Sequence, residues 1–127
     1  MTEERCPFCN IIKDRILLEN GSGYVISDGF PVSPGHSLII PRDHYADFFD
    51  IPETVRYDLF RLVDDGKKFL DSQLSPNGYN IGINSGAAAG QTVPHLHIHL
   101  IPRFNGDQAD PRGGIRWIFP CKANYWS

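Results

Sequence analysis

The stretch that decides the fold is His95-Leu96-His97-Ile98-His99-Leu100-Ile101-Pro102. Histidine and an apolar residue alternate strictly along it, and side chains two positions apart in a strand point to the same face of a sheet. A strand would therefore line one face with three imidazoles and turn the apolar side chains toward a core. A helix would separate His97 from the other two histidines, so the alternation predicts a strand over 95–102.

Three imidazoles on one strand face are compatible with three interpretations. A neutral imidazole nitrogen is a nucleophile near pH 7 that can attack phosphorus, and neighbouring imidazoles can donate to the phosphoryl oxygens. Histidines at this spacing also occur in zinc sites, and a solvated polar face would show the same pattern. The spacing alone leaves these three possibilities open.

Length and composition indicate one ordinary globular domain over residues 1–127, because the chain has 127 residues, 41% of them hydrophobic and 21% charged. The formal net charge is −3, so no basic field points to nucleic acid or to a membrane surface. The acidic N-terminus, Met1-Thr2-Glu3-Glu4-Arg5, is unlike a signal peptide. These features predict a cytoplasmic protein.

The remaining patterns predict an α+β fold, an antiparallel sheet of about five strands with one long helix on one face. Strands are expected at 16–19, 24–27, 37–40 and 79–84, and a short N-terminal helix at 10–15. For the long helix we expect Asp50 as the N-cap, Pro52 in the first turn, Glu53 completing a capping box, and an end at 76–78. The core would span about 6–103, followed by a loop and tail over 104–127.

The triad stretch resembles the signature of the histidine triad family, His-φ-His-φ-His-φ-φ, where φ is apolar. Two further segments are similar to the family's: Ser33-Pro34-Gly35-His36-Ser37-Leu38-Ile39-Ile40-Pro41 and Gly90-Gln91-Thr92-Val93-Pro94-His95. The likeness covers roughly residues 6–103. It implies a HIT-like fold and a homodimer. It also implies a nucleotide hydrolase or transferase that acts at the α-phosphate of a purine nucleotide. Nucleic acid is not expected as a substrate, because no basic patch or additional zinc-finger segment follows the triad.

The resemblance implies a role for each of three histidines. His97 would be the nucleophile that carries a covalent nucleoside monophosphate, His99 would contact the phosphate and leaving group, and His36 would support the ring of the nucleophile.

The resemblance also implies a set of nucleotide contacts. Asp28 would accept the ribose hydroxyls, Asn84, Gly90, Gln91 and Thr92 would lie beside the phosphate, and Phe8, Ile11 and Ile26 would wall the base. Asp28 could instead only initiate a turn, Asn84 could only end its strand, and the three apolar residues could be plain core.

Cys6 and Cys9 have the spacing of a zinc knuckle, but two thiolates need two more ligands. Members of the family with this cysteine pair complete the site with a downstream histidine and the first triad histidine, which here are His44 and His95. The resemblance thus implies a structural zinc, with a redox dithiol or two buried thiols as alternatives. Cys121 is expected to be a free thiol.

The resemblance leaves the substrate divided between two branches. The cysteine pair is similar to the Hint-like branch, which favours nucleoside phosphoramidates, and the segments around His36 and Gln91 to the Fhit-like branch, which splits diadenosine polyphosphates. A polyphosphate substrate could bring Mg, and Arg103, Arg112 and Arg116 could reach it. Two alternatives stay open: a non-catalytic nucleotide-binding scaffold, and a metallohydrolase with its metal on the triad.

Overall fold

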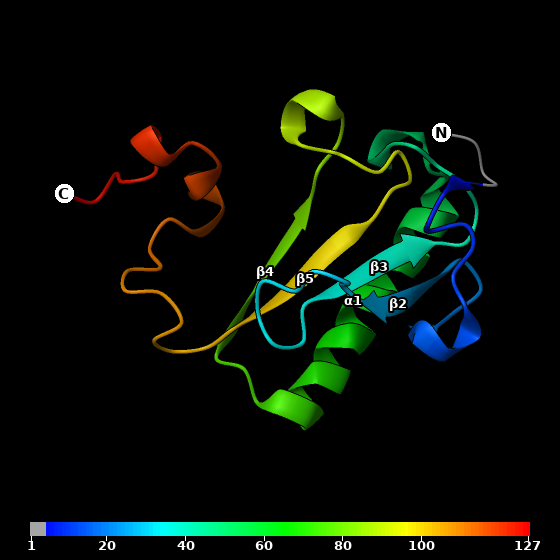
Figure 1. Cartoon of the computed structure of the whole chain (residues 1–127), viewed down its shortest axis with the longest axis horizontal. Helices are drawn as coiled ribbons and strands as arrows, with labels where there is room; N and C mark the ends of the chain where they lie inside the picture. The colour runs from blue at the N-terminus through cyan, green and yellow to red at the C-terminus, as the bar shows by residue number, and fades with distance from the viewer. Residues whose placement is uncertain (1–4) are drawn as a thin grey trace.

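The protein, a computed structural model that describes residues 5–127, has one five-stranded antiparallel sheet (Figure 1). Its strands are β1 (Ile16–Glu19), β2 (Gly23–Ser27), β3 (Ser37–Pro41), β4 (Gly78–Ile83) and β5 (Ile98–Arg103). They lie in the order β1-β2-β3-β5-β4, so the histidine-bearing strand β5 lies between β3 and β4. The predicted α+β class is confirmed. Residues 1–4 of the acidic N-terminus lie outside the described residues.

The long helix α1 (Glu53–Leu74) packs on one face of this sheet. The main core combines helix and sheet residues, Val25, Ile39, Leu59, Leu62, Val63, Leu70, Ile98 and Leu100, with Ile51 and Leu96 from the segments before α1 and β5. Gly66 allows the close approach of α1 to β5, because a Cβ added there would lie 3.0 Å from Cδ2 of Leu100. A second cluster covers part of the opposite face: Phe8, Ile11 and Ile16 on Tyr24, Ile26, Leu38 and Ile40.

The predicted capping box of α1 is wrong. Asp50 does not cap the helix but ends a short 3-10 turn, η3 (Phe48–Asp50), whose N-cap is Asp47. The residue before a proline is pushed out of the helical region, and Ile51 is accordingly extended at φ −78° and ψ 142°. The helix therefore begins after Pro52, which is the N-cap and makes no side-chain cap hydrogen bond.

The histidine strand is shorter than predicted. β5 begins at Ile98, and His95 and His97 precede it. The backbone N–H of Leu96 donates to the carbonyl of Tyr45 at 2.7 Å, which takes it out of the sheet ladder. The alternation survives, because Leu96 and Ile98 are buried in the core while the His97 side chain lies in the cleft.

Two other segments also differ from a plain reading of the sequence. The expected helix at 10–15 is only a 3-10 turn, η2 (Lys13–Arg15). The tail 104–127 contains two 3-10 turns, η5 (Gly114–Ile118) and η6 (Pro120–Lys122), and lies beside β4 (Figure 1). Within residues 5–127 no helix has the length and apolar character needed to cross a membrane.

Candidate active site

A cleft of about 580 Å³ opens on the sheet face opposite α1. The sheet beneath it pairs one row of residues across four strands, Ile26, Leu38, His99 and Gly82, of which Leu38 and His99 line the cleft. A Cβ added at Gly82 would meet nothing within 4 Å, so the floor is open beside His99. The cleft is lined by Pro7, Phe8, Arg15, Asp28, Gly29, Phe30, Val32, His36, Leu38, Asn84, Gly90, Thr92, Val93, His97 and His99.

The protonation of His97 follows from its backbone partner. Its Nδ1 lies 3.0 Å from the main-chain oxygen of His95, and a carbonyl oxygen can only accept a hydrogen bond, so Nδ1 carries the proton. Nε2 of the neutral ring therefore holds the free lone pair. The rings of Phe8 and His99 each contact the ring of His97 edge-on, at 5.1 Å between centroids. The result is an oriented imidazole with a nucleophilic nitrogen in the cleft.

His36 contacts His99 and not His97, so the predicted support of the nucleophile's ring is wrong. The backbone N–H of Val32 donates to Nδ1 of His36 at 3.2 Å, which leaves the single proton of His36 on Nε2. That proton points at Nδ1 of His99, 2.9 Å away. His99 is therefore an acceptor at Nδ1, and its own proton lies on Nε2, the nitrogen left to bond a phosphoryl oxygen.

Burial keeps both of these histidines neutral. Desolvation is the main cause that lowers the pKa of His99 to about 4; the nearby His97 and His36 also lower it, whereas Asp28 raises it. Burial also lowers the pKa of His36, against the opposing effect of Asp28. At neutral pH, His99 thus acts as a hydrogen-bond donor with a fixed tautomer and carries no positive charge.

Asp28 has two contacts. One carboxylate oxygen accepts from the backbone N–H of Phe30 at 2.7 Å, which is the turn-initiating role. The other oxygen lies 3.3 Å from Nε2 of His36. Asp28 also lines the cleft, so its carboxylate has both the structural role and the position expected for a ribose contact.

Of the four residues predicted beside the phosphate in the loop before the triad, three line the cleft and one does not. Asn84, Gly90 and Thr92 line the cleft, as the resemblance implies. The side chain of Gln91 instead faces the protein: its Oε1 accepts from the N–H of Gly86 at 2.8 Å. Its Nε2 donates to the carbonyls of Ala46 and Val93 at 2.6 and 3.1 Å. Gln91 holds the loop and is not among the residues that line the cleft.

Of the three apolar residues predicted to contact the base, only Phe8 lines the cleft. Ile26 is fully buried, and Ile11 packs beneath in the second core cluster. Sequence reasoning missed several lining residues, among them Arg15, Phe30 and Val32. A signal was available for Phe30, because an apolar residue between Gly29 and Pro31 in a turn is expected at the surface, and its exposed fraction is 91%.

The two cysteines, His44 and His95 form a metal-ligand set. Nδ1 of His95 lies 3.3 and 3.4 Å from the sulfurs of Cys6 and Cys9, and Nδ1 of His44 lies 3.1 Å from Cys9 and 3.2 Å from His95. Tetrahedral zinc with ligands at ~2.0–2.3 Å separates its donors by about 3.3–3.8 Å. The backbone oxygen of Pro41 lies 2.9 Å from Nε2 of His95, which places the lone pair on Nδ1, toward the other ligands.

A metal on the triad itself does not fit this geometry. His95 faces the cysteines and His97 bonds a backbone carbonyl, so the three triad rings do not converge. Donor atoms of Asp28, His36 and His99 do lie within 4.8 Å of one another. Because Val32 already donates to Nδ1 of His36, however, Nε2 could bind a metal only as an imidazolate.

Two of the three arginines proposed for a polyphosphate pair with carboxylates, and the third bonds backbone carbonyls. Arg103 donates to both carboxylate oxygens of Asp107. Arg112 pairs with Asp110, and Arg116 donates to two backbone carbonyls in the tail. In this structure the three side chains hold the end of β5 and the tail together.

Comparisons with known proteins agree with this geometry. The family model of the HIT domain matches residues 10–106. An uncharacterized HIT-like protein from Saccharolobus solfataricus is 37% identical, covering 80% of this chain and 76% of that protein. An adenosine 5′-monophosphoramidase from Candida albicans is 39% identical, covering 77% and 70%. An adenylylsulfatase from Arabidopsis thaliana is 37% identical and covers 80% of this chain but 54% of that longer protein.

A solved structure, that of a zinc-bound histidine triad family protein from Mycobacterium smegmatis, superposes with a TM-score of 0.77 at 32% identity, covering 86% of this chain and 82% of the other. The match of the family model and of these relatives extends over most of the chain. The chain therefore belongs to the histidine triad, or HIT domain, family.

Proposed function

We propose that this protein is a nucleotide hydrolase that cleaves at the α-phosphate of a purine nucleotide derivative through a covalent intermediate on His97. The observation that carries the proposal is the 3.0 Å contact between Nδ1 of His97 and the carbonyl oxygen of His95, which assigns the ring proton to Nδ1 and leaves Nε2 free in the cleft. The relatives named as adenosine 5′-monophosphoramidase and adenylylsulfatase support an adenylyl derivative as substrate.

The first step would be attack of Nε2 of His97 on the α-phosphorus. The bond from phosphorus to the leaving group breaks, and the leaving amine takes up a proton from solvent water. His99 donates from Nε2 to a phosphoryl oxygen, where negative charge increases in the transition state. Asn84 and Thr92 line the same cleft and support the phosphate. Water then attacks the nucleotidyl-His97, which releases the nucleoside monophosphate and restores the ring.

Zinc, in our proposal, is structural. Cys6, Cys9, His44 and His95 would supply all four ligands of a closed site, which leaves no open position for substrate. The ion would tie the N-terminal segment to the residue that holds His97, since the carbonyl of His95 is the acceptor for Nδ1 of His97.

A homodimer is part of the same proposal. Exposed apolar side chains on the tail support it: Ile115, Ile118, Phe119 and Tyr125 are 65, 73, 66 and 71% exposed. Contiguous exposed apolar residues mark interaction surfaces on globular proteins.

The test is intact-mass spectrometry after rapid quenching of the protein with adenosine 5′-phosphoramidate, with turnover followed in parallel. Wild type should gain the mass of an adenylyl group, and His97→Ala should neither gain it nor release AMP. A His97→Ala protein that hydrolyses the substrate at the wild-type rate would refute the nucleophile. Binding of AMP with no turnover by wild type would favour a nucleotide-binding scaffold.

A further inference from the structure

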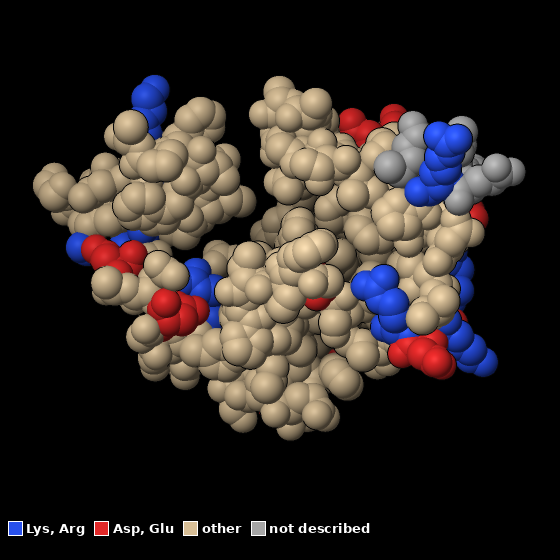
Figure 2. Space-filling model, viewed as in Figure 1, with Lys and Arg blue, Asp and Glu red and all other residues tan. Residues whose placement is uncertain are grey.

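Arg15 is the one lysine or arginine among the described residues that line the catalytic cleft. It ends η2, directly before β1, and its exposed side chain lies at the rim of the cleft. Figure 2 shows a surface that is mostly uncharged, with few and scattered Lys and Arg side chains. A cation in the cleft is therefore a distinct feature of this surface, and the proposed reaction gives Arg15 no role.

The guanidinium of Arg15 is held at the end of β2. Ile16 pairs with Ile26 in the antiparallel ladder of β1 and β2, so Arg15 lies opposite Ser27. Nη2 of Arg15 accordingly donates to the backbone oxygen of Ser27 at 3.3 Å. Because Ser27 directly precedes Asp28, the guanidinium lies beside the carboxylate that is proposed to bind the ribose.

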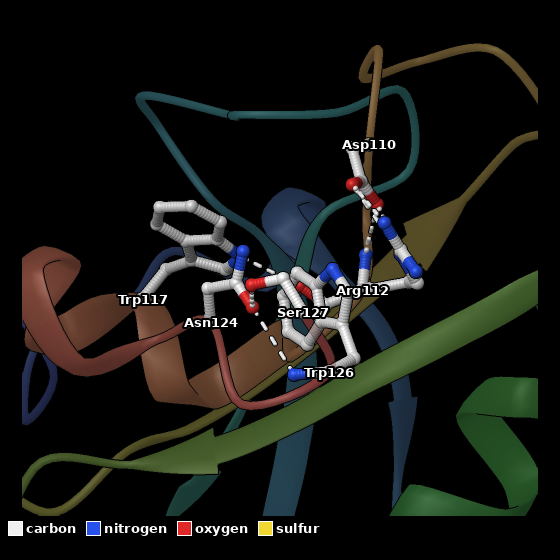
Figure 3. A network of polar contacts seen from close by, with 6 residues as sticks. All are labelled: Asp110, Arg112, Trp117, Asn124, Trp126 and Ser127. Carbon is white, nitrogen blue, oxygen red and sulfur yellow. Dashed lines mark hydrogen bonds and ion pairs between the residues drawn. The ribbon is translucent and has the colours of Figure 1, made fainter.

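Most of the donors of Arg15 are unused. Within residues 5–127 its side chain makes one hydrogen bond, to a neutral carbonyl, and no ion pair, whereas a guanidinium carries five N–H groups. The arginines on the side of the tail differ. Arg103 donates to Asp107 at 2.8 and 2.9 Å, and Figure 3 shows Arg112 bonded to Asp110. Arg15 therefore has donors available for a ligand in the cleft.

A nucleotide bound as in the proposed function has its base at the end of the cleft where Arg15 lies. The triad takes the phosphate and Asp28 takes the ribose, so the base lies beyond Asp28. The ring of Phe8 lines this cleft and can stack on the base. Gly29 leaves space there, because a Cβ added to it would meet nothing within 4 Å. An edge of the base then faces the guanidinium.

The chemistry of arginine restricts which base fits. Arginine only donates hydrogen bonds, so the edge that faces it must accept them. Guanine and hypoxanthine carry two adjacent acceptors, O6 and N7, which match the paired N–H groups of a guanidinium. Adenine keeps N7 but has an amino group at position 6, so a donor would face a donor. The side chain of Arg15 therefore favours a 6-oxopurine.

We propose that Arg15 is a specificity-determining residue that recognises the O6 and N7 edge of the base. The protein then binds 6-oxopurine nucleotides, those of guanine or hypoxanthine, more tightly than adenine nucleotides. The inference rests on the proposed function and narrows its purine to this class. Adenylyl derivatives remain substrates of the proposed reaction, with weaker binding.

The test is isothermal titration calorimetry of GMP, IMP and AMP on wild type, Arg15→Met and Arg15→Lys. Wild type should bind GMP and IMP about tenfold more tightly than AMP, toward the low end for a bidentate pair because the rim is solvated. Arg15→Met keeps an apolar stem without donors, so GMP and IMP should weaken to the Kd of AMP. Arg15→Lys keeps the charge without the planar fork and should recover only part of the preference.

A matched control is Arg61→Met, which removes the same charge from an exposed position on α1, on the other face of the sheet, and should change none of the three Kd values. Equal binding of GMP and AMP by wild type, or a preference that persists in Arg15→Met, would overturn the inference. So would IMP that binds like AMP, since the 2-amino group of guanine would then be the group recognised. Adenosine 3′,5′-bisphosphate that binds more tightly than AMP, and only when Arg15 is present, would overturn it by assigning the guanidinium to a phosphate.

Binding needs no turnover, which separates this inference from the proposed function. A protein that prefers GMP and IMP through Arg15 but hydrolyses neither adenosine nor guanosine 5′-phosphoramidate would support the base recognition and refute the hydrolase. Hydrolysis of both phosphoramidates with equal kcat/KM, together with equal binding of GMP and AMP, would support the hydrolase and refute the base recognition.

Discussion

In four of the five histidines, a hydrogen-bond partner determines which ring nitrogen carries the proton. The backbone oxygen of Pro41 accepts a hydrogen bond from Nε2–H of His95, and the oxygen of His95 accepts one from Nδ1–H of His97. The N–H of Val32 donates to Nδ1 of His36, whose Nε2–H then faces His99. In the proposed function, one residue type would therefore supply a metal ligand, a nucleophile, an orienting donor and a phosphate donor. The roles differ because the ring nitrogen that does not perform the role has a different hydrogen-bond partner in each histidine.

At the level of single residues, the zinc ligands and the nucleophile can be separated by mutation. Wild type should hold one zinc per chain by inductively coupled plasma mass spectrometry. Cys6→Ser removes a ligand that is 1% exposed and should lower that ratio well below one. His97→Ala should leave it near one, because the ring of His97 is outside the ligand set. Zinc lost from His97→Ala but kept by Cys6→Ser would contradict the assignment.

The lowered pKa of His99 predicts a loss of stability in mild acid. The unfolded chain takes up this proton below about 6.5, whereas the folded protein takes it up only near 4. The contribution of His99 to the free energy of unfolding is therefore complete above pH 6.5 and falls as the pH drops toward 4, at most by about 1.4 kcal/mol per pH unit. Urea titrations at several pH values with saturating zinc should show that the free energy of unfolding depends less steeply on pH in His99→Gln than in wild type. An equal pH dependence in both proteins would refute the role of His99.

Among the larger elements, the loop over 84–92 depends on one side chain. Gln91→Leu removes bonds to Gly86, Ala46 and Val93, so the loop should open more often and Kd for AMP should rise about tenfold, equivalent to ~1.4 kcal/mol. Hydrogen exchange at the Gly86 amide should quicken with it. Gln73→Leu, the same change at an exposed position on α1, is the control. Unchanged exchange at Gly86 would show that Gln91 does not hold the loop.

Elements with a local signal were predictable from the sequence. The apolar spacing of α1 and the hairpin before Ser27 depend on neighbours in the chain, and both were found. The start of α1 was missed because Pro52 overrides the capping pattern of Asp50. The partner of His36 was also missed: which of two triad rings it meets is set by the pairing of β3 with β5, with Leu38 opposite His99. No local pattern encodes that register.

Over the whole molecule, the proposed zinc would join parts of the chain that are distant in sequence. Cys6 and His95 are 89 positions apart and meet at 3.3 Å. Because an ion that binds only the folded state stabilises it by mass action, removal of zinc with a chelator should lower Tm. Differential scanning calorimetry should show the drop in wild type and little change in Cys6→Ser, which starts without the ion. An identical drop in both proteins would place the effect elsewhere.

The tail gives the last prediction, on assembly. It is tied together by polar contacts such as Arg116 to the carbonyls of Lys122 and Ala123, yet it turns apolar side chains outward. A second copy of the chain would cover them. Light scattering should give twice the chain mass of 14.3 kDa. Ile118→Asp should shift the protein toward the single-chain mass.

The matched control for that shift is Ile12→Asp. Ile12 is 65% exposed, close to the 73% of Ile118, and directly precedes η2 and β1, at the sheet edge opposite β4. A charge placed there adds the same desolvation cost if the residue is covered, and none if it stays in water. Dissociation by Ile118→Asp alone would assign the interface to the tail. Dissociation by Ile12→Asp alone would assign it to the opposite edge, and a wild type at the single-chain mass would refute the dimer.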